Sequence, residues 1–367
     1  MVSAKLRIGI IGAGTTGVYL ATLLARQGYQ VDLFERSPHP RAEGCGILLV
    51  TAGMKALHEG NPQMCQKLIN LGVAVKTFEF RNLRDQLVNL ESVSYEENEL
   101  PGLLVHRGAI LNTLLEELPP NCLHLNAQFK SAIQSDQGVI AYFSDGSYWK
   151  GDLLIGSDGI YSKVREFVVP GVQPIYLGDI VWRGVVSDTI FCTDGNFMVY
   201  VRGRGIYGNF FDIGNGLTHW GFFIEKDQEK HEVGTPQPKN IAIPPEELAK
   251  LPERPRAIIE STPQDQISCR FSYDIDPLPQ LYSGRILLLG DAAHAKSPTR
   301  ARGMTAGFED ALALSHYLNS KTNVDEALEA FQAERMPIVH EYQRTSREVS
   351  RKIGRSHKKI STSSASK

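Results

Sequence analysis

The feature that most constrains the fold is a glycine-rich segment near the start of the chain, G-A-G-T-T-G at residues 12–17. A short apolar run from Leu6 to Ile11 precedes it, and Val18 to Arg26 follow with the spacing of a helix, so the order is strand, tight turn, helix. Val31 to Glu35 is predicted to form a second strand. This part of the chain therefore predicts a βαβ unit with parallel strands and a right-handed crossover.

The glycines of this turn suit the binding of a dinucleotide. They permit a sharp turn and a close approach of the backbone to a pyrophosphate, and the following helix offers amide hydrogens and the positive end of its dipole. Glu35, at the end of the second strand, can accept hydrogen bonds from ribose hydroxyls. NAD and FAD present the same adenosine diphosphate to such a pocket, so this motif alone leaves both cofactors open.

Composition excludes several other classes of protein. The chain has 367 residues, 42% of them hydrophobic and 22% charged, which is typical of a folded globular protein. Its net charge of −2 supplies no positive field, so we expect no nucleic-acid partner. No apolar run reaches the roughly 18 residues of a transmembrane helix. The five scattered cysteines include no C-x-x-C pair, so we expect reduced thiols, a cytoplasmic location and no metal site.

Two later segments repeat the pattern of a buried strand followed by an aspartate. Leu153 to Ile155 leads into G-S-D-G-I-Y-S-K-V-R at residues 156–165, and Arg285 to Leu289 leads into G-D-A-A-H at residues 290–294. Each motif places an aspartate at the carboxyl end of a strand.

In this order, the three motifs resemble those of the single-component FAD-dependent monooxygenases, the flavoprotein aromatic hydroxylases that include para-hydroxybenzoate hydroxylase. The resemblance implies bound FAD, transient NADPH or NADH, and O2. It further implies a flavin hydroperoxide that hydroxylates, or epoxidises, a small aromatic or conjugated substrate. An FAD-dependent reductase or dehydrogenase of the same fold is the alternative, and a non-catalytic flavin-binding protein is a third possibility.

The resemblance also assigns cofactor contacts. Glu35 would hold the adenosine ribose, Arg107 would reach the FAD phosphates or ribityl chain, and Asp291 would bind the ribityl hydroxyls. Asp158 would contact the pyrophosphate region. The complete expected set of cofactor contacts is Gly12, Gly14, Thr16, Gly17, Glu35, Arg36, Arg107, Asp158, Asp291, Gly303 and Met304.

Catalytic residues are less clearly indicated. Where the family usually reads P-x-x-G-Q-G-x-N, this chain reads P-T-R-A-R-G-M-T, so Arg300 and Arg302 are candidates to bind an anionic substrate or alter flavin polarity. His294 is a candidate for proton transfer, although a packing or hydrogen-bonding role fits it better. Arg183, in W-R-G, lies on a strand that either faces the pocket or is a packed core strand.

The fold class expected is α/β, with a Rossmann-like FAD-binding domain, a mainly antiparallel β-sheet substrate domain and C-terminal helices. The FAD-binding domain is predicted to comprise 1–71, 101–175 and 281–350, and the substrate domain 72–100 and 176–280, with a flexible tail at 351–367. Pro337 is expected to kink or break the last helix. The alternating aromatics between 210 and 223 are read as sheet core more readily than as a cavity lining. Substrate identity, the choice between NADPH and NADH, and the oligomeric state are left open.

Overall fold

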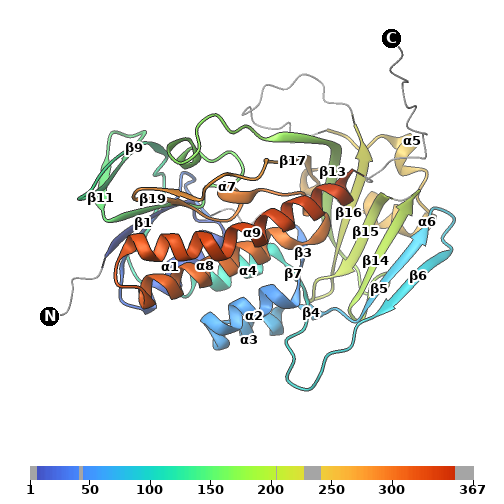
Figure 1. Cartoon of the computed structure of the whole chain (residues 1–367). Helices are drawn as coiled ribbons and strands as arrows, with labels where there is room; N and C mark the ends of the chain where they lie inside the picture. The colour runs from blue at the N-terminus through green and yellow to red at the C-terminus, as the bar shows by residue number, and fades with distance from the viewer. Residues whose placement is uncertain (1–5, 41–43, 204, 227–240, 352–367) are drawn as a thin grey trace, which may run out of the picture.

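The computed structural model describes residues 6–40, 44–203, 205–226 and 241–351. It is an α/β protein in which a Rossmann-like sheet with helices packs beside a larger, mainly antiparallel sheet (Figure 1). The predicted tail falls almost wholly outside these residues. No helix in the described ranges is long and apolar enough to cross a membrane.

The Rossmann-like sheet has six strands in the order β18-β19-β12-β1-β2-β8. Its strands are β1 Arg7–Ile11, β2 Gln30–Phe34, β8 Leu123–His124, β12 Leu153–Gly156, β18 Tyr282–Ser283 and β19 Ile286–Leu288. All neighbouring pairs are parallel except β18 with β19. The strands β12 and β19 are buried throughout, as expected when both faces of a parallel sheet are covered. The three glycine or aspartate turns therefore emerge at one edge.

Helices pack around this sheet and on one another. They are α1 Thr15–Arg26, α2 Thr51–Gly60, α3 Pro62–Leu71, α4 Arg107–Leu115, α7 Asp291–His294, α8 Arg302–Ser320 and α9 Val324–Ser350. Helix α8 approaches α1 closely because Gly307 has no side chain, and a Cβ there would lie 2.0 Å from Oγ1 of Thr16. In Figure 1, α8 and α9 run side by side across the front of the molecule.

The expected break at Pro337 is wrong, because α9 runs through this residue without interruption. Buried Arg335 and Gln343 lie on either side of the proline and anchor the helix: Arg335 pairs with Asp310 and Gln343 donates to the carbonyls of Ile275 and Ala295. These contacts offset the loss of one helical hydrogen bond.

The second sheet has seven strands in the order β17-β13-β16-β15-β14-β5-β6. Its strands are β5 Thr77–Asn82, β6 Leu87–Ser92, β13 Ile175–Ser187, β14 Asn196–Arg202, β15 Gly205–Asp212, β16 Leu217–Glu225 and β17 Ser268–Asp274. Neighbours are antiparallel except β14 with β5, which are parallel. Strands from two separate stretches of sequence thus share one sheet.

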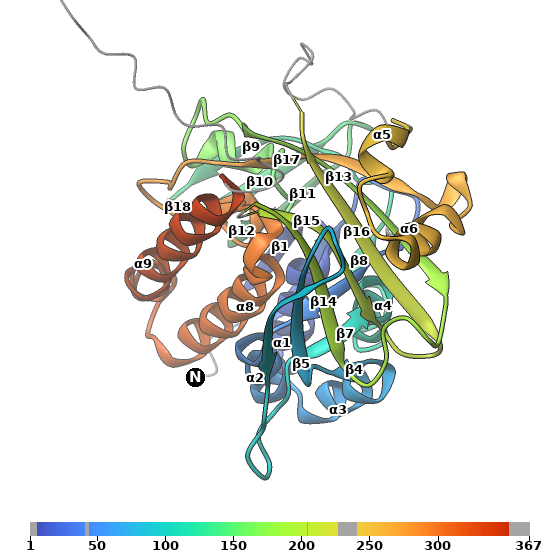
Figure 2. The ribbon, with the colours of Figure 1, turned by 90° about the vertical axis from the view of Figure 1, so that its right-hand side faces the viewer.

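The two faces of this sheet bury different aromatic residues. The outer face carries Trp182, Phe210, Trp220 and Phe222, which form a core with Leu251 and other residues near the short helices α5 Pro245–Leu248 and α6 Glu253–Glu260. Figure 2 shows these helices against the sheet. The inner face includes Phe211, which packs with Leu104 of the first domain. The aromatic residues between 210 and 223 are therefore divided between the two faces of the sheet, and most of them belong to the core on the outer face.

Smaller sheets and 3-10 turns complete the described part of the fold. The three-stranded sheets are β11-β10-β9 and β3-β7-β4. Their strands are β3 Gly46–Leu49, β4 Val73–Ala74, β7 Leu103–His106, β9 Phe129–Ser135, β10 Gly138–Phe143 and β11 Tyr148–Gly151. The 3-10 turns are Val164–Phe167, Gln264–Gln266 and Pro298–Arg300. Strands β3 and β7 lie beside β15 and β16 and so form the inner wall opposite the large sheet.

Candidate cofactor and substrate site

The first turn contains three glycines, and the space around each of them differs. Gly12 has φ +105°, and a Cβ on it would lie 2.5 Å from the carbonyl oxygen of Ser157. A Cβ on Gly17 would lie 2.1 Å from the carbonyl oxygen of Gly12. Around Gly14, by contrast, a Cβ would meet nothing within 4 Å among the described atoms. The protein itself therefore requires Gly12 and Gly17, whereas Gly14 borders open space at the start of α1.

Glu35 closes this turn from the end of β2. Its Oε2 accepts the backbone N–H of Ala13 at 3.0 Å, and its Oε1 accepts that of Ser37 at 2.9 Å. Each carboxylate oxygen retains a lone pair, so the side chain can also accept ribose hydroxyls. Arg36 beside it is exposed. Thr16 lies at the start of α1, but its side chain is inserted between Gly290 and Gly307.

In the second turn, the carboxylate of Asp158 accepts hydrogen bonds from residues of the same turn. Asp158 accepts hydrogen bonds from Oγ of Ser162 at 2.5 Å and from the backbone N–H groups of Lys163 and Val164 at 2.8 and 3.3 Å. Burial nevertheless raises its pKa. Gly159 follows with φ +82° and open space beside it. Asp158 therefore shapes the turn, and the surface this turn offers a ligand is mainly backbone.

Arg165 connects the second and third turns. Its guanidinium donates to the carbonyl oxygen of Ile160 at 2.6 Å and to that of Ala292 at 3.0 Å. Ala292 directly follows Asp291, which is exposed although the next residues of α7 are buried. A Cβ on Gly303, at the start of α8, would lie 3.9 Å from Oδ1 of Asp291. The structure thus brings Asp291 beside the N-terminal end of α8, with room for a ligand.

His294 belongs to a buried network behind this turn. Its Nε2 lies 2.6 Å from Oδ2 of Asp310, and Nζ of Lys296 lies 2.8 Å from its Nδ1. An ammonium group only donates, so Nδ1 accepts and Nε2 carries the proton given to Asp310. Asp310 also accepts from Nε of Arg335 at 2.9 Å and from the N–H of Gly290 at 3.0 Å. With both ring nitrogens engaged, His294 holds the turn in place.

Arg300 and Arg302 belong to the loop whose sequence differs from the usual family motif, and this loop lies near α9. Cζ of Arg302 lies 5.1 Å from the centre of the Tyr342 ring. The pKa of Glu341 is lowered chiefly by Arg344 and also by Arg300, which places Arg300 near the same helix. Ala301 between them has the left-handed φ of +51°. The guanidinium of Arg302 thus packs on α9.

Arg183 lies on the inner face of the large sheet, because its neighbour Trp182 points into the outer core. Cys45 and Arg107 of the opposite wall influence its pKa, as do Asp179 and Arg270. Burial lowers the pKa of Arg183, and the positive charges of Arg107 and Arg270 lower it further. No side chain or carbonyl in the described residues forms a hydrogen bond or ion pair with the guanidinium of Arg183 or of Arg107. Each of the two facing walls therefore holds one cation that has no partner among the described residues, Arg183 on the sheet and Arg107 opposite it.

His219 joins the two walls and was not found by sequence reasoning. Its Nδ1 accepts the backbone N–H of Gly46 at 3.0 Å, which links β16 to β3. Burial lowers its pKa to about 3, helped by Arg183. The imidazole is therefore neutral and carries its proton on Nε2. Its only sequence signal was a lone histidine in an alternating strand, which most often marks a packed core residue.

Comparison with known families supports a flavin-binding reading of these turns. Residues 277–346 match the family described as FAD binding domain, and residues 10–64 match the NAD(P)-binding Rossmann-like domain. The first range holds Asp291 and Gly303, and the second holds Gly14 and Glu35. The open backbone beside Gly14, the carboxylate of Glu35 and the exposed Asp291 suit the pyrophosphate, ribose and ribityl groups of FAD.

Curated relatives over most of the chain are monooxygenases of aromatic rings. The chain is 28% identical over 357 residues to 3-amino-4-hydroxybenzoate 2-monooxygenase of Streptomyces cremeus, covering 95% of this chain and 88% of the relative. It is also 28% identical to salicylate hydroxylase of Pseudomonas putida, covering 94% and 85%. Over nearly its whole length the chain is therefore similar to aromatic-ring monooxygenases.

Solved structures share the fold of this chain. HpxO of Klebsiella pneumoniae, solved with FAD and uric acid, has a TM-score of 0.83 at 21% identity and covers 94% of this chain and 88% of its own. The 2,6-dihydroxypyridine-3-hydroxylase of Arthrobacter nicotinovorans has a TM-score of 0.82 at 21% identity, covering 98% and 96%. When bound, FAD supplies the chemistry by which NAD(P)H reduces it and one atom of O2 is transferred.

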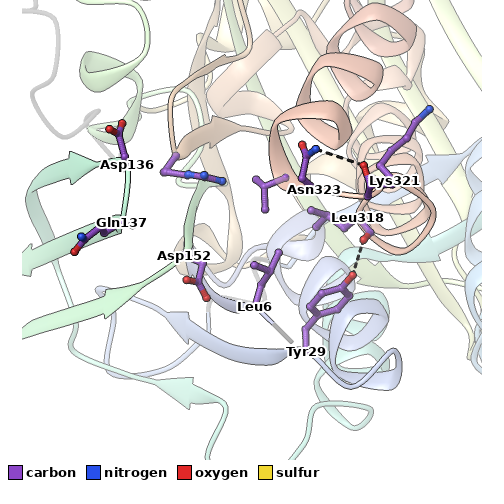
Figure 3. A pocket seen from close by; sticks show the side chains of 12 residues that line it. Leu6, Tyr29, Asp136, Gln137, Asp152, Leu318, Lys321 and Asn323 are labelled. Atoms are coloured by element: carbon purple, nitrogen blue, oxygen red, sulfur yellow. Dashed lines mark hydrogen bonds between the residues drawn. The ribbon is translucent and has the colours of Figure 1, made fainter. Parts of the chain in front are cut away.

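A separate surface pocket of this FAD-dependent monooxygenase lies at the other edge of the Rossmann-like sheet. It has a volume of about 450 Å³ and is lined by residues such as Leu6, Asp152 and Arg285, each of which precedes a strand (Figure 3). Tyr29 borders it and donates to the carbonyl oxygen of Leu318 at 2.7 Å. Parallel sheets bind ligands at the opposite, carboxyl edge, so this pocket is not the flavin site.

Proposed function

We propose that this monooxygenase hydroxylates a small aromatic ring that carries an anionic group, and that Arg183 binds this group. The unpaired guanidinium of Arg183 is the observation that carries the proposal. A half-buried cation with no partner is costly, and a carboxylate offers it two parallel hydrogen bonds. Arg107 adds positive charge on the facing wall.

The relatives' names support a ring carboxylate. They act on 3-amino-4-hydroxybenzoate and on salicylate, and a further relative, 27% identical, is the 6-hydroxynicotinate 3-monooxygenase of Bordetella bronchiseptica. Each of these named substrates is an aromatic ring with a carboxylate. Hydroxylation is therefore proposed over epoxidation, and the acceptor ring is proposed to lie between the large sheet and β3.

The proposal also assigns the residues that contact FAD. Direct contacts are proposed for Gly12, Gly14, Gly17, Glu35, Arg36, Arg107, Asp291, Gly303 and Met304, and positioning roles for Thr16 and Asp158. Ranges 1–71, 101–175 and 281–350 are proposed to form the FAD-binding domain, and 72–100 and 176–280 the substrate domain. NADPH or NADH is proposed to dock transiently. The five cysteines form no disulfide, which suits the proposed cytoplasmic location.

The test is oxygen-dependent NADPH oxidation with a panel of benzoates and the matching neutral phenols. Hydroxylated product is expected from a benzoate and not from its neutral analogue. Arg183→Met should raise KM for the benzoate by roughly 10-fold or more while the variant keeps its FAD. Arg256→Met, on α6 at the outer face, is the matched control and should leave KM unchanged. Equal use of neutral phenols, or loss of FAD alone in Arg183→Met, would contradict the assignment.

A further inference from the structure

A second unpaired polar group lies on the same face of the large sheet as Arg183. Arg183 of β13 is paired in register with Gly221 of β16, and Gly221 is paired with Asn209 of β15. Side chains of residues directly opposite in an antiparallel sheet lie on the same face. Arg183 and Asn209 therefore flank a residue that has no side chain, in one row across three strands.

This face is the one turned toward the flavin-binding domain. His219 lies two residues before Gly221 and bonds to Gly46 of β3. Phe211 lies two residues after Asn209 and packs with Leu104 of β7. Since side chains alternate along a strand, Asn209 shares the face of Phe211 and Gly221 shares that of His219. The row thus forms part of the wall against which the proposed substrate lies.

The amide of Asn209 lacks a partner in the described part of the chain. Its Oδ1 is buried and accepts no hydrogen bond, and its Nδ2 donates none. A buried carbonyl oxygen without a donor destabilises the folded chain, so such an atom calls for an explanation. A ligand with an O–H or N–H group directed at Oδ1 would satisfy it.

Gly221 gives the amide its position. A Cβ on Gly221 would lie 2.3 Å from Oδ1 of Asn209, so the amide extends over the glycine toward the strand of Arg183. The short Asn209 side chain stays close to the sheet, whereas the long Arg183 side chain reaches toward Cys45 and Arg107. The two groups can therefore contact different ends of one small ring.

We propose that Asn209 selects substrates with a ring hydroxyl or amino group, which donates its hydrogen to Oδ1, and that Gly221 keeps the amide in place for this contact. The inference rests on the proposed function, in which Arg183 holds the anionic group of the same ring. It makes Asn209 a specificity-determining residue. The ring substituent replaces the missing donor, so an aromatic acid without one leaves the buried oxygen unsatisfied.

The experiment measures dissociation constants by the absorbance change of the FAD-loaded enzyme. The probes are benzoate and the 2-, 3- and 4-hydroxy and amino benzoates. Wild-type enzyme should bind at least one substituted acid roughly 10-fold more tightly than benzoate. In Asn209→Leu this preference should fall below about 2-fold, while the benzoate constant stays within about 2-fold of wild type. Gly221→Ala should displace the amide and reduce the preference in the same way.

Stability without ligand separates recognition from a structural role. Replacing an unsatisfied amide by the similar-sized leucine should leave the unfolding temperature of the FAD-loaded enzyme unchanged or raised. The control is Gly102→Ala, where a Cβ would meet only ordinary contacts from 3.5 Å outward, and its preference should equal wild type.

The outcomes separate the two proposals. If benzoates bind, Arg183→Met abolishes their binding and Asn209→Leu keeps the full preference, the role of Asn209 is overturned and the proposed function stands. The role is also overturned if the wild-type enzyme shows no preference, or if Asn209→Leu is destabilised and loses benzoate binding with it. If wild-type enzyme binds no benzoate, or Arg183→Met binds them normally, the proposed function fails and takes this inference with it.

Discussion

Nε2 of His294 lies 2.6 Å from Oδ2 of Asp310, and this contact joins the third cofactor turn to α8. The same carboxylate oxygen accepts the N–H of Gly290, the residue before Asp291. Its other oxygen accepts from Arg335 of α9. One buried carboxylate therefore fixes the turn against two helices, so the histidine of G-D-A-A-H has a positioning role here.

Asp310→Asn should be strongly destabilising. The change leaves Arg335 and the buried turn without their shared charge partner, and breaking a buried ion pair costs on the order of 3 kcal/mol. The free energy of unfolding in urea measures this loss. The comparison is Glu341→Gln, which breaks an exposed pair with Arg344 and should change stability by no measurable amount. Equal effects of the two substitutions would show that burial of the Asp310 network contributes nothing.

Gly14→Ala should separate cofactor binding from folding. Because a Cβ at Gly14 meets nothing within 4 Å, the apoprotein should fold with an unchanged unfolding temperature. The methyl group would occupy the space proposed for the pyrophosphate, so the FAD dissociation constant should rise by roughly 10-fold or more. Gly17→Ala is the contrasting variant, because its Cβ would lie 2.1 Å from the carbonyl oxygen of Gly12 and should destabilise the apoprotein itself. Normal FAD binding by Gly14→Ala would remove this turn from the cofactor site.

His219 should make stability depend on pH. Its pKa is lowered to about 3 by burial and by Arg183, against about 6.5 in the unfolded chain. Between these values only the unfolded chain binds the proton, so stability falls as pH falls, by about 1.4 kcal/mol per pH unit for this group. His219→Asn keeps an acceptor for the N–H of Gly46 but does not titrate. Unfolding at pH 7 and pH 5 should show a loss about 2 kcal/mol smaller in the variant. An identical loss in both proteins would contradict the neutral state of His219.

The double variant Arg300→Ala, Arg302→Gln tests the sequence-based hypothesis that these cations bind an anionic substrate. Because Arg302 packs over Tyr342 and Arg300 lies near Glu341, we expect the benzoate dissociation constant to stay within about 2-fold of wild type. The loss of the contact with Tyr342 should lower stability by no more than about 1 kcal/mol. A marked weakening of benzoate binding with normal stability would instead support the original hypothesis.

The sequence by itself determined the βαβ start, the three glycine and aspartate motifs and the resemblance to the FAD-dependent monooxygenases. These features depend on local periodicity and on glycines next to strands, both of which are legible in short stretches of chain. Strand pairing was less accessible, as the parallel pair of β14 with β5 illustrates, because it joins segments far apart in the sequence. The continuous α9 likewise depends on what Arg335 and Gln343 contact in the core.

Tertiary structure alone decided which polar groups share a site. The sequence offered Arg300 and Arg302 as candidates for an anionic substrate and left open whether Arg183 faces a pocket, whereas in the fold Arg302 packs on Tyr342 of α9 and Arg183 lies on the inner face with no partner among the described residues. Asn209 gave no signal at all, because its significance lies in the register that places Gly221 beside it. A sheet register is set by contacts among distant strands, and a shift of one residue would turn Asn209 to the opposite face.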